Sequence, residues 1–392
     1  MDALQQGIVT LIRGSLTGEQ LALPERFDLE TAYSQIVRHG IVALAYDGAV
    51  KCGVDKKLPV MQKLFHGYCR CLQRSEAQLR AIERICVAFD EAGIDYMPLK
   101  GCNLKMLYPK PELRVMGDAD ILVRTAQYIQ IRPVMQVLGY EEQLESNHEL
   151  IWNSRDLHLE LHKRLIPSYN EDYYRYFGDG WRLAKRQKGT RYAMTQEDEY
   201  IYIFTHFAKH YRDGGIGCRH VTDLWVYRRA CSQMDEQYIA AELDKLQLLE
   251  FERNIRRLTE VWFEDRGSDE KTDFIADFIF RSGSWGSAEA HTVSAGVKSA
   301  SEAGSVTGGR ARRVLQAAFP SAEALQNRYP VLRKYPALLP AIWPVRMITA
   351  ALFRRDNIRK QRETIACATV EKIESYQQAL NYVGLDFHFR ED

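Results

Sequence analysis

The 392-residue chain lacks several features that mark particular protein classes. Its first residues, MDALQQGIVTLIRG, have no basic segment followed by an apolar core and a small-residue cleavage site, so we expect no secretory signal. Its eight cysteines are scattered without a CxxC pair, which argues against zinc-binding cysteine clusters and against a disulfide framework. We therefore expect reduced thiols and a cytoplasmic location.

Long apolar runs are missing too. The most apolar stretch, residues 335–353, contains three prolines and Arg346 and falls short of a membrane-spanning helix. We expect a buried, proline-kinked helix there, and contact with a membrane surface through residues 335–360 is the less favoured alternative.

The chain has no large excess of either charge. Lysine plus arginine number 53 against 52 aspartates plus glutamates, so a long nucleic acid is not expected as a partner. The imbalance is local: between Arg310 and Arg362 there are twelve basic residues and two acidic ones, and twelve minus two gives +10. A solvated helical face and a surface for an anionic ligand or membrane both fit this pattern.

Hydrophobic periodicity divides the chain into five regions. Residues 1–92 have helical spacing, residues 93–195 contain short alternating runs, and residues 196–281 return to helical spacing. Residues 282–309 are almost entirely small and polar and are predicted to form a flexible loop, and residues 310–392 form a basic helical C-terminal region. The order predicts an α+β fold with a small mixed sheet as its core.

The core elements follow from local signals. A helix bounded by Ser75 and Gly93 is expected to precede a strand at 96–100, a short helix at 101–108 and a strand at 118–123. A helix capped by Thr125 and ending near Gly139 comes next. Two strands of an antiparallel meander are expected at 149–154 and 157–165. The clearest later helices are 200–213, 219–230 and a last helix near 357–382.

Two carboxylates stand in the apolar strand 118–123. Because alternate side chains share one face of a strand, Asp118 and Asp120 are expected to project together, with Ala119 and Ile121 on the opposite face. Two like charges this close repel each other unless a cation lies between them or one takes up a proton. Hard anionic oxygen ligands suit Mg²⁺ or Mn²⁺, so the pair indicates a divalent-metal site.

Neighbouring residues add to this pattern. Gly101 lies between a strand and a short helix, where backbone N–H groups can bind phosphate oxygens. Arg114 is suited to bidentate pairing with a phosphate. In the segment LHLELH, Glu160 shares a face with His158 and His162, and we expect it to be a third carboxylate supplied by an adjacent antiparallel strand.

The string LKGCNLKMLYPKPELRVMGDADILV resembles the LKG…RxMGDxD signature of an uncharacterised bacterial family of nucleotidyltransferases. The segments HFAKHYRDGGIGCRHVTDLW and FPSAEALQNRYPVLRKYPALLPAIWPVR resemble helical parts of the same family, so the resemblance extends from about residue 75 to 360. It implies a nucleotidyltransferase-type sheet core. It also implies transfer of an NMP group from an NTP to a hydroxyl of a small molecule or protein, with release of pyrophosphate and with Mg²⁺ or Mn²⁺ as cofactor.

The resemblance also implies roles for single residues. The implied catalytic residues and metal ligands are Asp118, Asp120 and Glu160. The implied nucleotide-binding residues are Lys100, Gly101, Cys102 and Arg114. Many relatives have serine where this chain has Cys102, and aspartate where it has Glu160.

Several histidines carry weaker signals. His206 and His210 are four residues apart on a predicted helix and share a face, but Phe207 excludes the HExxH motif of zinc proteases. A substrate-pocket role and a structural histidine pair both remain open for them. The residues predicted to line a substrate pocket are His162, His206, His210, Arg219 and Asp223.

A second hypothesis comes from a different functional class. A non-catalytic nucleotide-sensing or scaffold protein of the same fold would use the basic helical region to dock a partner or a membrane. Turnover of an NTP separates the two hypotheses.

Overall fold

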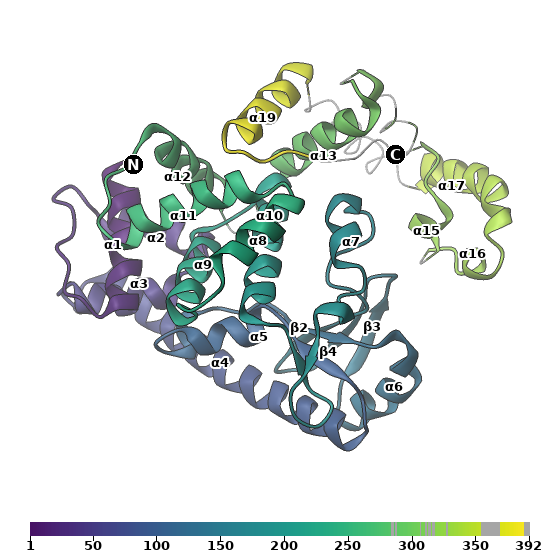
Figure 1. The fold of residues 1–392 in the computed structure, drawn as a ribbon, viewed down its shortest axis with the longest axis horizontal. Helices are drawn as coiled ribbons and strands as arrows, with labels where there is room; N and C mark the ends of the chain where they lie inside the picture. The colour runs from purple at the N-terminus through teal and green to yellow at the C-terminus, as the bar shows by residue number, and fades with distance from the viewer. Residues whose placement is uncertain are drawn as a thin grey trace. The chain divides into compact units, whose positions relative to one another are not determined.

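A computed structural model describes residues 1–283, 286, 288–305, 307–309, 312, 315, 318–326, 328–353 and 369–387 (Figure 1). The chain forms two compact units. Unit 1 comprises Met1–Lys209 and Ile216–Trp285, and unit 2 comprises His210–Gly215 and Gly286–Asp392.

A five-stranded mixed sheet forms the centre of unit 1. Its strands are β1 (Tyr96–Pro98), β2 (Ala119–Val123), β3 (Glu141–Glu145), β4 (Glu149–Asn153) and β5 (His158–His162). Their order in the sheet is β1-β2-β5-β4-β3. The pair β2–β5 is parallel, and the other three neighbouring pairs are antiparallel. The predicted α+β fold with a small mixed sheet is confirmed.

The alternating sequence of the strands gives the sheet an apolar face and a polar face. The apolar face carries Ala119 and Ile121 of β2, Leu159 and Leu161 of β5, and Trp152 of β4, all of them buried. Helices α4 (Pro59–Glu91) and α6 (Tyr128–Val137) cover it, and Figure 1 shows both on one side of the sheet. The acidic and basic side chains of β2, β4 and β5 therefore lie on the opposite face.

Helices before and after the sheet complete unit 1. The first three helices are α1 (Ala3–Thr17), α2 (Leu29–Arg38) and α3 (Val42–Lys51). The connections within the core contain α5 (Gly101–Leu104), η1 (Lys105–Leu107), η2 (Pro111–Leu113), η3 (Thr125–Gln127), α7 (Glu171–Phe177), η4 (Trp181–Leu183) and the hairpin β6 (Lys185–Arg186) and β7 (Tyr192–Ala193). The later helices are α8 (Gln196–Arg212), whose last three residues belong to unit 2, α9 (Cys218–Ala230), α10 (Glu236–Lys245), α11 (Leu249–Phe263) and α12 (Glu270–Ser282).

Four local predictions for unit 1 differ from the structure. Helix α4 begins at Pro59 rather than near Ser75, because proline is favoured at the first helical position and the buried stripe starts at Val60. The Ser75 hydroxyl instead accepts a hydrogen bond from Lys105 Nζ at 2.7 Å. Thr125 opens a 3₁₀ turn and forms no side-chain cap. Strand β3 was not predicted, because its side chains are mostly exposed and carry no apolar alternation.

The direction of β5 is the fourth difference. The sequence predicted an antiparallel strand beside β2, but β5 runs parallel to it. Helix α6 returns the chain along the sheet, and the hairpin β3–β4 then reverses it before β5 begins. The segment between β2 and β5 is long enough for a parallel crossover. The sequence prediction considered only the short spacing between β4 and β5, which suggested antiparallel strands.

Unit 2 contains a helix where a flexible loop was predicted. Within residues 282–309, Ala288–Ala303 forms α13. Alanine favours helix, and Val293, Val297 and Ala300 repeat at three- and four-residue steps to give a narrow buried stripe. The stripe packs in unit 2, where α13 contacts α19 (Val370–Tyr382). The sequence predicted a loop because residues 282–309 contain few large hydrophobic side chains, and this prediction is wrong for Ala288–Ala303.

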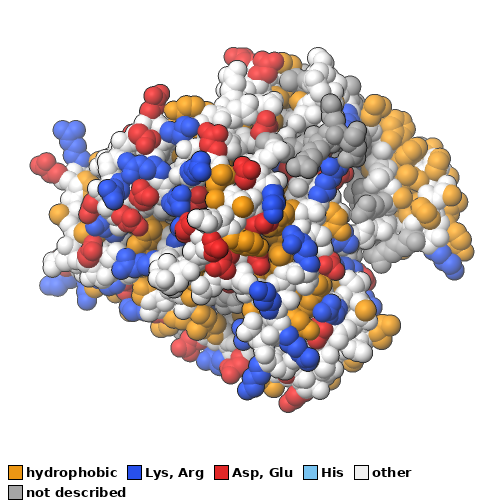
Figure 2. All heavy atoms as spheres, in the orientation of Figure 1, with side chains coloured by type: hydrophobic (Ala, Val, Ile, Leu, Met, Phe, Trp, Pro, Cys, Tyr) orange, Lys and Arg blue, Asp and Glu red, His pale blue; other side chains and the backbone are white. Residues whose placement is uncertain are grey.

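The apolar stretch 335–353 forms η5 (Pro336–Leu338) and α17 (Leu339–Phe353), with Pro344 inside the helix. The prediction of a buried helix is wrong for the described side chains, since Leu338, Val345 and Met347 are exposed. Figure 2 shows hydrophobic side chains gathered on the surface of this part of the chain. Two short helices precede it, α15 (Ala322–Leu325) and α16 (Val331–Lys334).

None of the described helices has the length and apolarity needed to cross a membrane. Residues 354–368, which contain many of the basic residues of the Arg310–Arg362 stretch and the start of the predicted last helix, lie outside the described residues.

A buried histidine in unit 1 generates a stability prediction. His39, at the C-terminal end of α2, accepts a hydrogen bond from the Cys218 N–H at 3.2 Å and contacts Phe280 edge-on. Burial lowers its pKa from 6.5 to about 4. The unfolded state thus binds the proton more tightly, and stability falls as pH drops below about 6.5.

We expect His39 to cost the protein about 2 kcal/mol of unfolding free energy between pH 7.5 and pH 5. The variant His39→Gln keeps a hydrogen-bond acceptor that does not titrate, so its stability should decline less over this range. Urea unfolding followed by circular dichroism at both pH values measures the difference. Equal pH dependence in the two proteins would contradict the assignment.

Candidate active site

Two carboxylates, those of Asp120 and Glu160, lie next to each other on the polar face of the sheet. In the parallel pair β2–β5, Asp120 lies directly opposite Glu160, so both side chains point to the same face. His162 lies two residues further along β5, and its Nε2 atom is 2.7 Å from Asp120 Oδ1 and 3.5 Å from Glu160 Oε2. The sequence correctly placed Asp120, Glu160 and His162 on one face.

Lys100 approaches the same carboxylate from the turn after β1. Its Nζ atom is 3.6 Å from Asp120 Oδ1 and 5.8 Å from the ring centroid of Tyr202 on α8. The backbone of Lys100 has φ 35° and ψ −103°, a conformation that L-residues rarely adopt. Strain of this kind costs on the order of 1–3 kcal/mol and is concentrated at functional sites, where surrounding contacts hold it in place.

Opposite charges compensate each other in this cluster. Burial would raise the pKa of Asp120, but the charge of Lys100 and the hydrogen bond from His162 hold it well below the usual range. Burial would lower the pKa of His162, but its interactions with Asp120 and Glu160 raise it to about 8. The interaction with His162 lowers the pKa of Glu160 against the effect of burial.

Asp118 experiences the opposite balance. It immediately precedes β2 and is half-buried. Burial and the negative charges of Asp120 and Glu160 raise its pKa above the usual value. A cation bound beside Asp118 would oppose both effects.

Two further ligand-type residues, which the sequence did not single out, lie beside this cluster. Glu149 is opposite His162 in the antiparallel pair β4–β5, and His148 immediately precedes β4. Burial, followed by the positive charges of His162 and Lys100, lowers the pKa of His148 to about 3, so its ring is neutral near pH 7. The sequence did contain one indication of Glu149: it is the first residue of the predicted strand 149–154, an acidic residue next to an apolar segment. His148 lies directly before this strand.

Metal-ligand chemistry is present on this face. Among the described residues, the groups whose ligand atoms lie within 4.8 Å of one another are Asp120, Glu160 and His162, and His148, Glu149 and His162. The first group, with Asp118 next to it, offers the hard oxygen ligands that suit Mg²⁺ or Mn²⁺.

Comparison with known proteins places the chain in a family. The model of a family described as uncharacterised nucleotidyltransferases matches residues 25–264. The chain belongs to this nucleotidyltransferase family. It is an enzyme of the class that transfers nucleotide groups. The match contains the whole sheet and every residue of the cluster described above.

The remaining comparisons add little. The comparison with curated proteins finds no match. One solved structure, the solution structure of the antibiotic-resistance factor ANT(2'')-Ia, is 14% identical, with 47% of this chain and 94% of that chain covered. Its TM-score of 0.31 is too low to extend the family assignment.

The predicted nucleotide-binding turn of this nucleotidyltransferase is tightly packed. A Cβ atom on Gly101 would lie 3.0 Å from Met116 Sδ and 3.1 Å from Arg114 Nη1, so the absence of a side chain permits this close approach. The Cys102 thiol is buried in the apolar core and faces the carbonyl oxygen of Asp120 at 3.6 Å. Burial raises its pKa to about 12, so the thiol is neutral near pH 7.

Arg114 is bound to a carboxylate from another helix. Its Nε and Nη2 atoms donate to the two oxygens of Asp223 on α9 at 2.7 and 2.9 Å, and the Tyr108 hydroxyl donates to Asp223 at 2.7 Å. Arg219, also on α9, donates to the Val115 carbonyl at 3.1 Å. These contacts join α9 to the loop that precedes β2, so they hold the segment that leads to Asp118.

The other predicted histidines lie in different surroundings. His158 is close to Glu160, with Nε2 3.6 Å from Oε1. His206 and His210 are half-buried on α8, four residues apart as expected, and His210 falls in unit 2. Neither belongs to the two metal-ligand groups found among the described residues.

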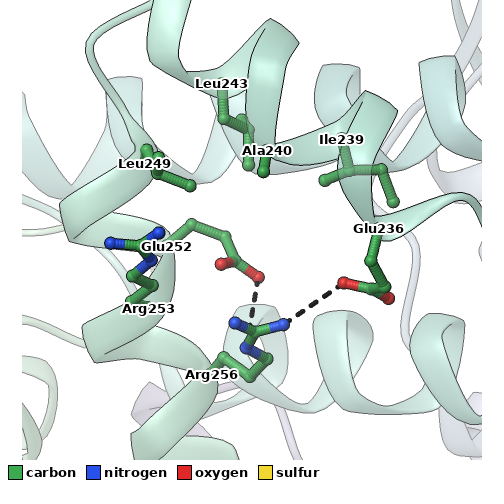
Figure 3. Close-up of a pocket in the computed structure, with 8 residues that line it drawn as sticks. All are labelled: Glu236, Ile239, Ala240, Leu243, Leu249, Glu252, Arg253 and Arg256. Atoms are coloured by element: carbon green, nitrogen blue, oxygen red, sulfur yellow. Dashed lines mark hydrogen bonds and ion pairs between the residues drawn. The ribbon is translucent and has the colours of Figure 1, made fainter.

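A separate pocket lies between α10 and α11 (Figure 3). It is lined by Glu236, Ile239, Ala240, Leu243, Leu249, Glu252, Arg253 and Arg256. Arg256 is ion-paired with Glu236 at 3.3 Å and with the buried Glu252 at 3.8 Å. These charges partly neutralise one another, and the lining of the pocket includes none of the predicted site residues.

The pairing of Arg114 with Asp223 predicts a large effect on stability. Replacing one partner of a buried ion pair leaves the other charge uncompensated, which costs about 3–5 kcal/mol. We therefore expect Arg114→Ala to lower the unfolding free energy by this amount, and Arg114→Lys, which loses the two-point contact, to have an intermediate effect. Urea unfolding measures both.

Arg80→Ala is the matched control, because the exposed i,i+4 pair between Arg80 and Glu76 contributes less than about 1 kcal/mol. If Arg114→Ala unfolded like the wild type and instead raised the KM for an NTP, Arg114 would be a phosphate ligand and the structural assignment would be wrong.

Proposed function

We propose that this nucleotidyltransferase uses Mg²⁺ to transfer an NMP group from an NTP to a hydroxyl of a small molecule or protein. The observation that carries the proposal is the in-register pairing of Asp120 with Glu160 on the polar face, with Asp118 adjacent and Lys100 buried against them. This arrangement concentrates three carboxylates within residues 25–264, the part of the chain that the family model matches.

The residues present fit a divalent cation. Three carboxylates, Asp118, Asp120 and Glu160, lie close together, and burial and the negative charges of the other two raise the pKa of Asp118. When bound, Mg²⁺ would polarise the phosphate oxygens and stabilise the charge that develops during the displacement. Asp118, Asp120 and Glu160 would hold it.

The protein groups then have distinct tasks. The acceptor hydroxyl oxygen forms a bond to the α-phosphorus and releases its proton to solvent, the bond from this phosphorus to the bridging oxygen breaks, and pyrophosphate leaves. Lys100 supplies a fixed positive charge, in a strained turn that sets its direction, for binding the triphosphate. His162 hydrogen-bonds Asp120 and fixes the orientation of that carboxylate.

The proposal includes a cytoplasmic location. It is supported by the seven cysteines of the described part of the chain, all of which are free thiols.

The donor and reaction type are tested with labelled nucleotides. Purified protein with Mg²⁺ is incubated with each of the four NTPs, labelled at the α or the γ phosphate, together with cell extract as the source of acceptor. We expect label from the α position to appear on an acceptor and label from the γ position to appear in pyrophosphate. Transfer of the γ label to an acceptor would indicate a kinase and refute the proposal.

The carboxylate assignment is tested in the same assay with Asp118→Asn and Asp120→Asn. These substitutions preserve shape and remove the charge, so we expect each to lower the transfer rate about 100-fold or more. Asp156→Asn is the control, because Asp156 is an exposed carboxylate in the turn between β4 and β5. Wild-type rates in both site variants would refute the assignment.

A further inference from the structure

The group His148, Glu149 and His162 forms a compact triangle of ligand atoms beside the carboxylates. His162 Nδ1 is 3.2 Å from His148 Nε2 and 3.9 Å from Glu149 Oε2, and the same Glu149 oxygen is 3.8 Å from His148 Nε2. The three atoms come from β5, from β4 and from the residue before β4, which the antiparallel ladder holds together.

These separations fit a metal ion. In a tetrahedral zinc site with bonds of about 2.0–2.2 Å, neighbouring ligand atoms are about 3.3–3.6 Å apart. The observed edges of 3.2, 3.8 and 3.9 Å lie close to this range, and the shortest is a hydrogen bond between the two rings, which a bound ion would replace. At 3.8 and 3.9 Å the Glu149 oxygen is too far away to form hydrogen bonds with either ring, whereas a cation among the three atoms would interact with all of them.

The second nitrogen of His162 has the partner that a ligand histidine requires. Metal-binding histidines usually pass their other ring N–H to a carboxylate, which fixes the tautomer and the ring orientation. His162 Nε2 lies 2.7 Å from Asp120 Oδ1, which leaves Nδ1 to face His148 and Glu149. His148 differs from His162 in this respect: its Nε2 atom faces the triangle, and its other ring nitrogen, Nδ1, is buried without a hydrogen-bond partner.

We propose that His148, Glu149 and His162 bind a divalent transition-metal ion of the Zn²⁺ class. Two imidazole nitrogens and one carboxylate oxygen are a ligand set for such an ion, whereas Mg²⁺ prefers oxygen ligands alone. The site is thus chemically distinct from the carboxylates Asp118, Asp120 and Glu160.

The surroundings permit a cation and leave it accessible. Lys100, Lys209 and Arg164 add positive charge near His148, but Glu149 lies within the triangle, and Asp120 and Glu160 lie beside it. The side chains of His148 and Glu149 are 18% and 21% exposed, so a fourth coordination position can face solvent or a substrate atom.

The test measures metal binding directly and does not depend on nucleotidyl transfer. Tag-free full-length protein is stripped with a chelator and titrated with Zn²⁺ by calorimetry in excess Mg²⁺, which occupies oxygen-ligand sites. Co²⁺ is then added in place of Zn²⁺. We expect one high-affinity ion per chain and the strong visible absorption of tetrahedral Co²⁺, without the thiolate charge-transfer band that cysteine ligands would produce.

The variants divide into three predicted classes. His148→Ala and the isosteric Glu149→Gln should abolish the Co²⁺ spectrum or weaken the affinity well over 10-fold. Asp120→Asn, which removes the negative charge of the outer partner of His162, should weaken it about 10-fold. Asp118→Asn and His66→Ala, the latter an exposed histidine on α4, should bind as the wild type does.

Circular dichroism establishes that each variant is folded. The inference is overturned if the wild type binds neither Zn²⁺ nor Co²⁺ under these conditions, or if His148→Ala and Glu149→Gln bind like the wild type. Loss of binding in Asp118→Asn equal to that in His148→Ala would place the ion at the carboxylates and would also overturn it. Because no NTP is present, these outcomes are separate from failure of the proposed transfer reaction.

Discussion

The buried charge of Asp120 is the constraint on which the rest of the site depends. A carboxylate removed from water costs several kcal/mol unless it is paired and hydrogen-bonded. Here Lys100 and His162 supply the compensation from two different segments, at 3.6 and 2.7 Å. The strained turn at Lys100 brings its ammonium group to this anion, and the β2–β5 register places β5 beside the strand that carries it. The strained backbone of Lys100 is unfavourable by itself, and the ion pair with Asp120 offsets this cost.

The sheet makes this concentration of charge compatible with folding. Its alternating strands send Ile121, Leu161 and Trp152 toward α4 and α6, and this apolar face supplies the burial that stabilises unit 1. The opposite face is then available for groups that a core does not accept. A single-residue shift in the β2–β5 register would exchange the two faces, so the same packing that stabilises the sheet also places Asp120 beside Glu160.

The sequence predicted the features that depend on local pattern. Strand alternation placed Asp120, Glu160 and His162 on one face, and the family signature assigned the chemistry. Properties that depend on distant contacts were not accessible: the parallel direction of β5 follows from the path through α6 and β3, and the Arg114–Asp223 pair joins residues 109 positions apart. Glu149 and His148 were missed for the same reason, since only the β4–β5 ladder brings them to His162.

His162 connects the two groups of ligands on this face. Its Nε2 atom faces Asp120 and Glu160, and its Nδ1 atom faces His148 and Glu149. An imidazole has one plane and two nitrogens, so whatever fixes one nitrogen also determines the direction and the proton of the other. The proton and the direction of Nδ1 are therefore linked to the contact between Nε2 and Asp120. The polar face is therefore one electrostatic unit, in which the orientation of the His162 ring is linked to the charge of Asp120.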